Sequence, residues 1–175
     1  MQIRWIPAFS ALAVATLAFA AKITTDYDHH VNFGTYHTYS WIGVRAGNSL
    51  WQDRIQRAVD MALAGKGWMK VLSGGQTSVS AFGRTREQDT LQTFYDGFPG
   101  WGWRGWGGGI GTATTEVQPT EIGSLTVDIF DTGNKKLIWR GTATGTLSSN
   151  PEKNDKTLDK SVMEMFQKFP PQEKG

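Results

Sequence analysis

One long segment alternates apolar and polar side chains on both sides of a short turn, and this pattern constrains the fold most strongly. Its first run places Leu125, Val127 and Ile129 on one face of an extended backbone, because side chains two residues apart in a strand share a face. A cluster of turn residues follows at 131–134, and residues 137–143 then alternate in the same way. The pattern predicts an antiparallel β-hairpin.

Two other segments carry apolar residues at the spacing of an amphipathic helix. The first stripe consists of Trp51, Ile55, Ala58, Val59 and Ala62. The second stripe consists of Leu158, Val162, Met165, Phe166 and Phe169. The first helix is predicted to begin with a capping box of Ser49 and Gln52 and to end at Gly65. The second helix is predicted to end at Pro170, since proline cannot continue a helix.

The remaining segments are predicted to be extended. Residues 22–43 are rich in threonine, tyrosine and isoleucine and are expected to form two strands. In the second of these strands, His37, Tyr39 and Trp41 are expected to face the core. Residues 77–96 are also expected to be extended. The order of elements predicts an α+β fold, an antiparallel β-sheet of about five or six strands with two amphipathic helices packed on one face.

Residues 1–20 have the features of a secretory signal peptide. Arg4 supplies a positive charge, residues 6–19 are apolar, and Ala18 and Ala20 form a small-residue cleavage site. The apolar run is shorter than the roughly 20 residues that span a bilayer. We therefore expect cleavage after Ala20, with an uncleaved anchor as the alternative. The mature chain is expected to be soluble in the periplasm or secreted, without a transmembrane helix.

The composition predicts one globular domain at residues 21–171, followed by a polar tail at 172–175. Hydrophobic residues make up 39% of the chain and charged residues 19%, which is typical of a folded domain. The net charge of +2 is too small to favour a nucleic-acid partner. The chain has no cysteine, which excludes disulfides, a catalytic thiol and a lipid-modified cysteine. We therefore do not expect a lipoprotein.

Residues 97–111 contain eight glycines and three tryptophans and are interpreted as a long loop between two strands. Exposed aromatic rings stack on sugars, on other rings or in the headgroup region of a membrane. This favours an unknown envelope component as partner, whether protein, glycan or membrane surface. The candidate binding residues are Phe98, Trp101, Trp103, Arg104 and Trp106. Two alternatives stay open: the rings pack back on the sheet, or the loop is a low-complexity segment without a ligand.

The same segment contains a G-x-G-x-x-G match at Gly100, Gly102 and Gly105. A dinucleotide site requires a strand before this motif and a helix after it, whose N-terminus holds the pyrophosphate. Here Phe98 and Pro99 precede the match, and further glycines follow it. No cofactor is therefore expected.

The histidines His29, His30 and His37 lie near Asp26 and Asp28, as a metal site would require. Neighbouring residues on a strand point to opposite faces, so surface roles are the simpler interpretation and no metal site is predicted. No serine lies in a G-x-S-x-G motif. We predict no catalytic residues and a non-catalytic binding or assembly domain. The alternative is a periplasmic hydrolase with an unrecognised active site.

The predicted hairpin at 123–147 and the last helix with its "FPP" ending at 158–171 resemble the bacterial domain-of-unknown-function family DUF4136. The resemblance extends over about 21–171 and is most specific at 137–143. Members of that family look like exported envelope proteins, and many are lipoproteins. Many carry a glycine- and aromatic-rich insert where this chain has 97–111. The resemblance implies an α+β envelope domain and supplies no catalytic residues.

Overall fold

The computed structural model describes the backbone of residues 21–95 and 113–171, and their side chains except those within 89–119. Three predicted segments lie outside the described residues, namely 1–20, 97–111 and 172–175.

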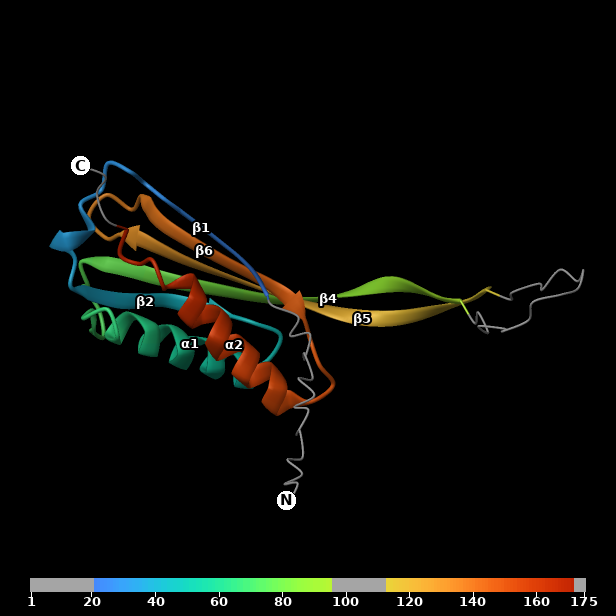
Figure 1. The fold of residues 1–175 in the computed structure, drawn as a ribbon. Helices are drawn as coiled ribbons and strands as arrows, with labels where there is room; N and C mark the ends of the chain where they lie inside the picture. The colour runs from blue at the N-terminus through green and yellow to red at the C-terminus, as the bar shows by residue number, and fades with distance from the viewer. Residues whose placement is uncertain (1–20, 96–112, 172–175) are drawn as a thin grey trace, which may run out of the picture.

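Within this part of the chain, one six-stranded sheet carries two helices on one face (Figure 1). The strands are β1 (Lys22–Tyr27), β2 (Thr38–Arg45), β3 (Met69–Lys70), β4 (Thr77–Tyr95), β5 (Ala113–Asp131) and β6 (Leu137–Thr146). The helices are α1 (Ser49–Ala64) and α2 (Pro151–Met165), with a short 3-10 helix, η1 (Phe33–Thr35). The strand order is β1-β6-β5-β4-β2-β3. The predicted α+β fold is confirmed.

Strand β2 departs from the antiparallel arrangement. It runs parallel to β4 and to β3, whereas the pairs β1–β6, β6–β5 and β5–β4 are antiparallel. Helix α1 follows β2 along the chain and returns the chain to the end of the sheet where β2 and β4 both begin. Parallel neighbours need such a crossover, because a hairpin turn reverses the direction of the chain. The sheet is therefore mostly antiparallel with a mixed edge.

The N-terminal cap of helix α1 is Asn48, one residue before the predicted capping residue Ser49. Asn48 has an extended backbone, and its side-chain oxygen accepts a hydrogen bond from the Trp51 amide at 3.0 Å. Ser49 already lies in the first turn of the helix, so the predicted capping box of Ser49 and Gln52 is wrong. Asparagine is as effective a cap as serine, and the extended residue takes the role. The end of the helix at Gly65 is confirmed.

The core lies between the sheet and the helices, and aromatic rings fill its end near the C-termini of α1 and α2. Trp139 packs on Phe166 with ring centroids 4.8 Å apart, and Phe169 lies 5.1 Å from Trp68. These four side chains are each at most 4% exposed. Tyr39 is buried as predicted, but His37 precedes β2 and is exposed, so its predicted core position is wrong.

Strands β4 and β5 extend beyond the sheet as a two-stranded ribbon (Figure 1). Their pairing continues without a shift to Tyr95 and Ala113. Strand β2 pairs with β4 only as far as Phe82, and β6 pairs with β5 only from Ile122 onward. We call residues 83–95 and 113–121 the β4–β5 ribbon. Among the described residues, no further strand pairs with either edge of the ribbon.

We expect Gly141→Ala to destabilise the fold by about 1–3 kcal/mol, because it overpacks the aromatic end of the core. A Cβ at Gly141 would lie 2.4 Å from the Met165 sulfur and 2.5 Å from the Trp139 ring. The matched control is Gly43→Ala in β2, where a Cβ meets no atom within 4 Å. Urea denaturation measures both variants, and equal stabilities would contradict this account of the core.

Candidate functional site

The β4–β5 ribbon determines where the predicted aromatic site is attached to the fold. Tyr95 and Ala113 lie directly opposite each other at the outer end of the ribbon. The intervening segment therefore joins the tip of the ribbon rather than the body of the sheet. The candidate binding residues themselves lie outside the described residues, namely Phe98, Trp101, Trp103, Arg104 and Trp106.

A cavity of about 240 Å³ lies where the ribbon leaves the sheet, beneath the N-terminal halves of α1 and α2. Strands β4, β5 and β6 each contribute a glycine to its lining, namely Gly83, Gly123 and Gly145. Because glycine has no side chain, Ile55 of α1 and Leu147 can pack closely on two of these positions, Gly83 and Gly123. A Cβ at Gly83 would lie 3.0 Å from Ile55 Cδ1, and a Cβ at Gly123 would lie 2.8 Å from Leu147 Cδ2.

The chemistry of this lining favours an uncharged, mainly apolar ligand. The walls include Trp51, Ile55 and Leu158, and the polar lining is formed mostly by hydroxyl and amide side chains. Arg84 is the charged residue of the lining, but its guanidinium lies over the Phe82 ring at 4.6 Å. No histidine, aspartate or glutamate lines the cavity within the described residues. Among the described residues, the lining thus combines apolar walls with hydroxyl and amide groups, as small-molecule pockets commonly do.

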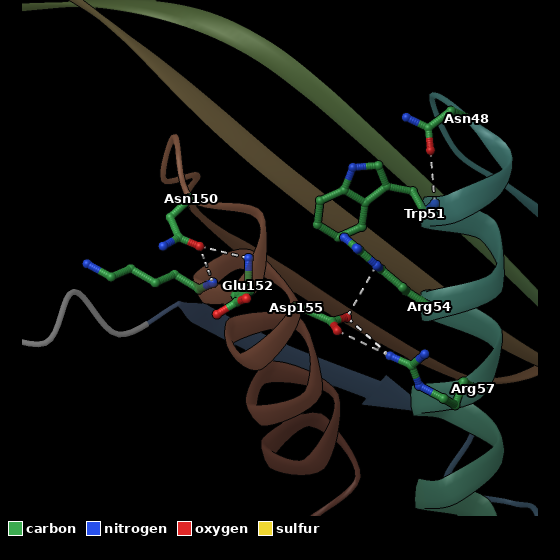
Figure 2. A network of polar contacts seen from close by, with 8 residues as sticks. Asn48, Trp51, Arg54, Arg57, Asn150, Glu152 and Asp155 are labelled. Atoms are coloured by element: carbon green, nitrogen blue, oxygen red, sulfur yellow. Dashed lines mark hydrogen bonds and ion pairs between the residues drawn. The ribbon is translucent and has the colours of Figure 1, made fainter.

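A polar network between the two helices borders the cavity (Figure 2). Asp155 of α2 accepts a hydrogen bond from Arg57 of α1 at 3.2 Å, and its carboxylate lies 3.6 Å from Arg54 Nε. The Arg54 guanidinium lies 5.5 Å from the centroid of the Trp51 ring, which lines the cavity. The network links the position of the Trp51 ring to the spacing of the helices.

The N-termini of both helices are capped by their own asparagines. Asn48 accepts from the Trp51 amide, and Asn150 accepts from the amides of Glu152 and Lys153 at 2.9 and 3.2 Å (Figure 2). Helix N-termini attract anions through such amide groups. Since these amides already have partners, the arrangement gives no support for an anionic ligand near the cavity.

The three histidines occupy surface positions. His29 and His30 lie in the turn after β1, where the His29 ring packs on Tyr27 at 4.3 Å and the His30 amide donates to Asp28. His37 precedes β2, and its amide donates to Gln76 Oε1 at 2.8 Å. Within the described part of the chain, no group of three or more metal-binding side chains could hold an ion.

The strongest pKa shifts belong to structural hydrogen bonds. The Tyr36 hydroxyl donates to Asp131 at 2.5 Å, which raises the pKa of Tyr36 to about 12 and lowers the pKa of Asp131. The Asn134 amide also donates to Asp131, so this carboxylate closes the β5–β6 turn. Burial, together with a hydrogen bond to Asp60, raises the pKa of Tyr39. These contacts hold the turn and α1 in place.

A second carboxylate joins three elements of the fold. Asp60 of α1 accepts hydrogen bonds from Tyr39 and Trp41 of β2, both at 2.8 Å. Lys70 of β3 forms an ion pair with the same carboxylate at 2.8 Å. Asp60 therefore connects the helix to the mixed edge of the sheet. Sequence patterns could not indicate this role, because the partners come from separate segments of the chain.

The DUF4136 family model, described as a domain of unknown function, matches residues 23–171, so the chain belongs to this family. No curated protein is similar enough to the chain to be matched. Within the described residues, neither helix has the length and apolar character required to cross a bilayer.

Three solved structures are similar to the chain at low sequence identity. A PDZ domain protein from Parabacteroides distasonis matches with a TM-score of 0.59 and 14% identity, over 90% of this chain and 37% of that protein. The chain thus spans well under half of that relative. A PelC dodecamer from Paraburkholderia phytofirmans matches with a TM-score of 0.49 and 11% identity, over 83% of this chain and 94% of PelC. A putative neuraminyllactose-binding hemagglutinin homolog from Helicobacter pylori matches with a TM-score of 0.42 and 8% identity, over 79% and 88% of the two chains.

We expect Tyr36→Phe to raise the pKa of Asp131 towards its usual value, because the hydroxyl that stabilises the charged carboxylate is lost. A lowered folded-state pKa stabilises the fold above the unfolded-state pKa, and this stabilisation is lost as the pH falls through the folded-state value. The variant should therefore lose less stability on acidification than the wild type. Carboxyl NMR titration and urea denaturation at neutral and acidic pH test this, with Tyr27→Phe as the control. An unchanged Asp131 titration would contradict it.

We expect the cavity to bind a small uncharged aromatic molecule, since an apolar cavity of about 150 Å³ is already large enough for benzene. Benzene should raise the Tm of the wild type and shift the NMR signal of the Trp51 indole. Ala143→Leu places three carbons in the cavity lining and should abolish both effects. Ala64→Leu adds the same carbons at an exposed position of α1 and should preserve them. Equal benzene binding by the two variants would place the ligand elsewhere.

Proposed function

We propose that the chain is an exported cell-envelope domain that acts by binding or assembly rather than by catalysis, and that the β4–β5 ribbon presents residues 97–111 to its partner. The observation that carries this proposal is the pairing of β4 with β5 as far as Tyr95 and Ala113, beyond the last pairs of β2 and β6. A ribbon of this kind separates its tip from the helices and the core. Such a tip can reach a second surface while the body stays folded.

The physical chemistry of the ribbon also supports a partner. An isolated two-stranded ribbon is only marginally stable in water. Its edges present unpaired backbone groups, which attract other chains unless they are protected. The candidate residues at its tip are large aromatic side chains with one arginine, a composition enriched in binding interfaces. The proposed partner is an envelope component, whether protein, glycan or membrane surface.

The proposed location is supported by the signal-peptide features of residues 1–20, including the small residues Ala18 and Ala20 at the expected cleavage site. The family, whose function is unknown, is compatible with a non-catalytic domain. Within the part of the chain that the structure describes, no observation favours the alternative of a hydrolase. Three of the described carboxylates have contacts that serve the fold, since Asp60, Asp131 and Asp155 hold helices, a strand and a turn.

The test replaces residues 96–112 with Asn-Gly, the pair that favours a two-residue hairpin turn between paired strands. Tyr95 and Ala113 are already opposite each other, so the ribbon should close without a change in register. We expect the variant to keep the Tm of the wild type and to lose the partners that the wild type captures from an envelope extract. A second variant, with Trp101, Trp103 and Trp106 replaced by alanine, should lose the same partners.

The bait protein is purified from the periplasmic fraction, and mass spectrometry reads its first residue, which we expect to be Ala21. Identical partner lists for all three proteins would overturn the role of residues 97–111. Recovery of the chain in the cytosol with residues 1–20 attached would overturn the proposed export.

A further inference from the structure

The inner part of the β4–β5 ribbon carries acidic side chains on the face that bears the helices. A Cβ at Gly83 would contact Ile55 of α1, so this position faces the helices. Side chains alternate along a strand, and Glu87 therefore lies on the same face. Glu121 of β5 is the direct partner of Glu87 in the register, which places two exposed carboxylates side by side.

The opposite face of the same part of the ribbon carries arginines. Arg84 and Arg86 alternate with Gly83 and Glu87, and both are exposed. The Arg84 guanidinium lies over the Phe82 ring at 4.6 Å, which places these two side chains on one face. The register partner of Arg86 is Ile122, which is partly exposed. The arginine face thus combines two cations with two apolar side chains.

Among the described residues, neither face has charged side chains paired with opposite charges. Like charges directly opposite each other on paired strands are destabilising, and Glu87 and Glu121 have this arrangement. Among the described residues, no ion pair involves Arg84, Arg86, Glu87 or Glu121. Elsewhere on the sheet the chain pairs such charges, as Arg140 and Asp128 form a two-pronged ion pair across β5 and β6. The ribbon is an exception to this pattern.

We propose that the inner part of the β4–β5 ribbon binds a second copy of this chain, whose arginine face packs on the acidic face of the first. An anionic surface would neutralise the arginines and leave the carboxylates unpaired, and a basic ligand would do the reverse. A second copy supplies both charges, and Phe82 and Ile122 supply the apolar contact between them. The charges set the orientation of the copies, since exposed ion pairs contribute more to specificity than to affinity.

The two faces differ, so the contact is heterologous and leaves one face of each copy available for a further copy. The proposal goes beyond the binding role of residues 97–111, because it concerns the inner part of the ribbon and not its tip. The protein with Asn-Gly in place of 96–112 should therefore still associate. This separates the failure of one proposal from the failure of the other.

The experiment uses two charge-reversed proteins. Arg84→Glu with Arg86→Glu makes both faces acidic, and Glu87→Lys with Glu121→Lys makes both faces basic. In analytical ultracentrifugation, we expect the wild type to associate, each reversed protein alone to sediment as a monomer, and an equimolar mixture to associate again. Raising the salt from about 0.1 M to about 1 M shortens the Debye length from about 10 Å to about 3 Å and should weaken the association.

The matched control for the arginine reversal is Lys153→Glu with Lys156→Glu. It makes the same change in net charge as that reversal, at exposed positions of α2, and should associate as the wild type does. Circular dichroism confirms that each variant is folded, as expected for exposed side chains. A monomeric wild type, association of a reversed protein by itself, or a mixture that stays monomeric would each overturn the proposal.

Discussion

The continuous pairing of β4 with β5 is the constraint on which the rest of the structure depends. Each strand is 19 residues long, and one register runs through both the sheet and the ribbon. In the sheet, this register places Val79, Val127 and Ile129 fully buried beneath the helices. A shift by one residue would move these side chains to the other face and would exchange the faces of the ribbon as well. The core therefore fixes which charges the ribbon presents on each side.

The space between the sheet and the helices is packed differently at its two ends. Near the C-termini of α1 and α2, four rings from three segments pack together, and Gly141 leaves room for them. Near the N-termini, glycines of three adjacent strands replace larger side chains, and a cavity of about 240 Å³ lies there. Dense packing at one end holds the helices on the sheet, so the other end can hold a binding pocket without loss of the fold.

Several features of the fold could be predicted because they repeat locally in the sequence. The helix stripe that includes Ile55 and Val59, and the alternation around Val127, identified the buried faces correctly. The errors arose where the backbone conformation of one residue or a neighbour in space decided the outcome. Asn48 rather than Ser49 caps α1, since the extended residue was one position earlier, and His37 binds Gln76 before the strand begins. The parallel course of β2 depends on the crossover through α1, which no local pattern encodes.

The sequence by itself determined the periodic elements, the family resemblance and the candidate aromatic residues, because each depends on neighbours along the chain. Only the tertiary structure decided where the ribbon leaves the sheet, which charges share a face, and where the cavity lies. These features bring together residues such as Trp51, Gly83 and Leu158 from distant segments. Their juxtaposition depends on strand order and register, and side-chain spacing along one segment carries no information about either.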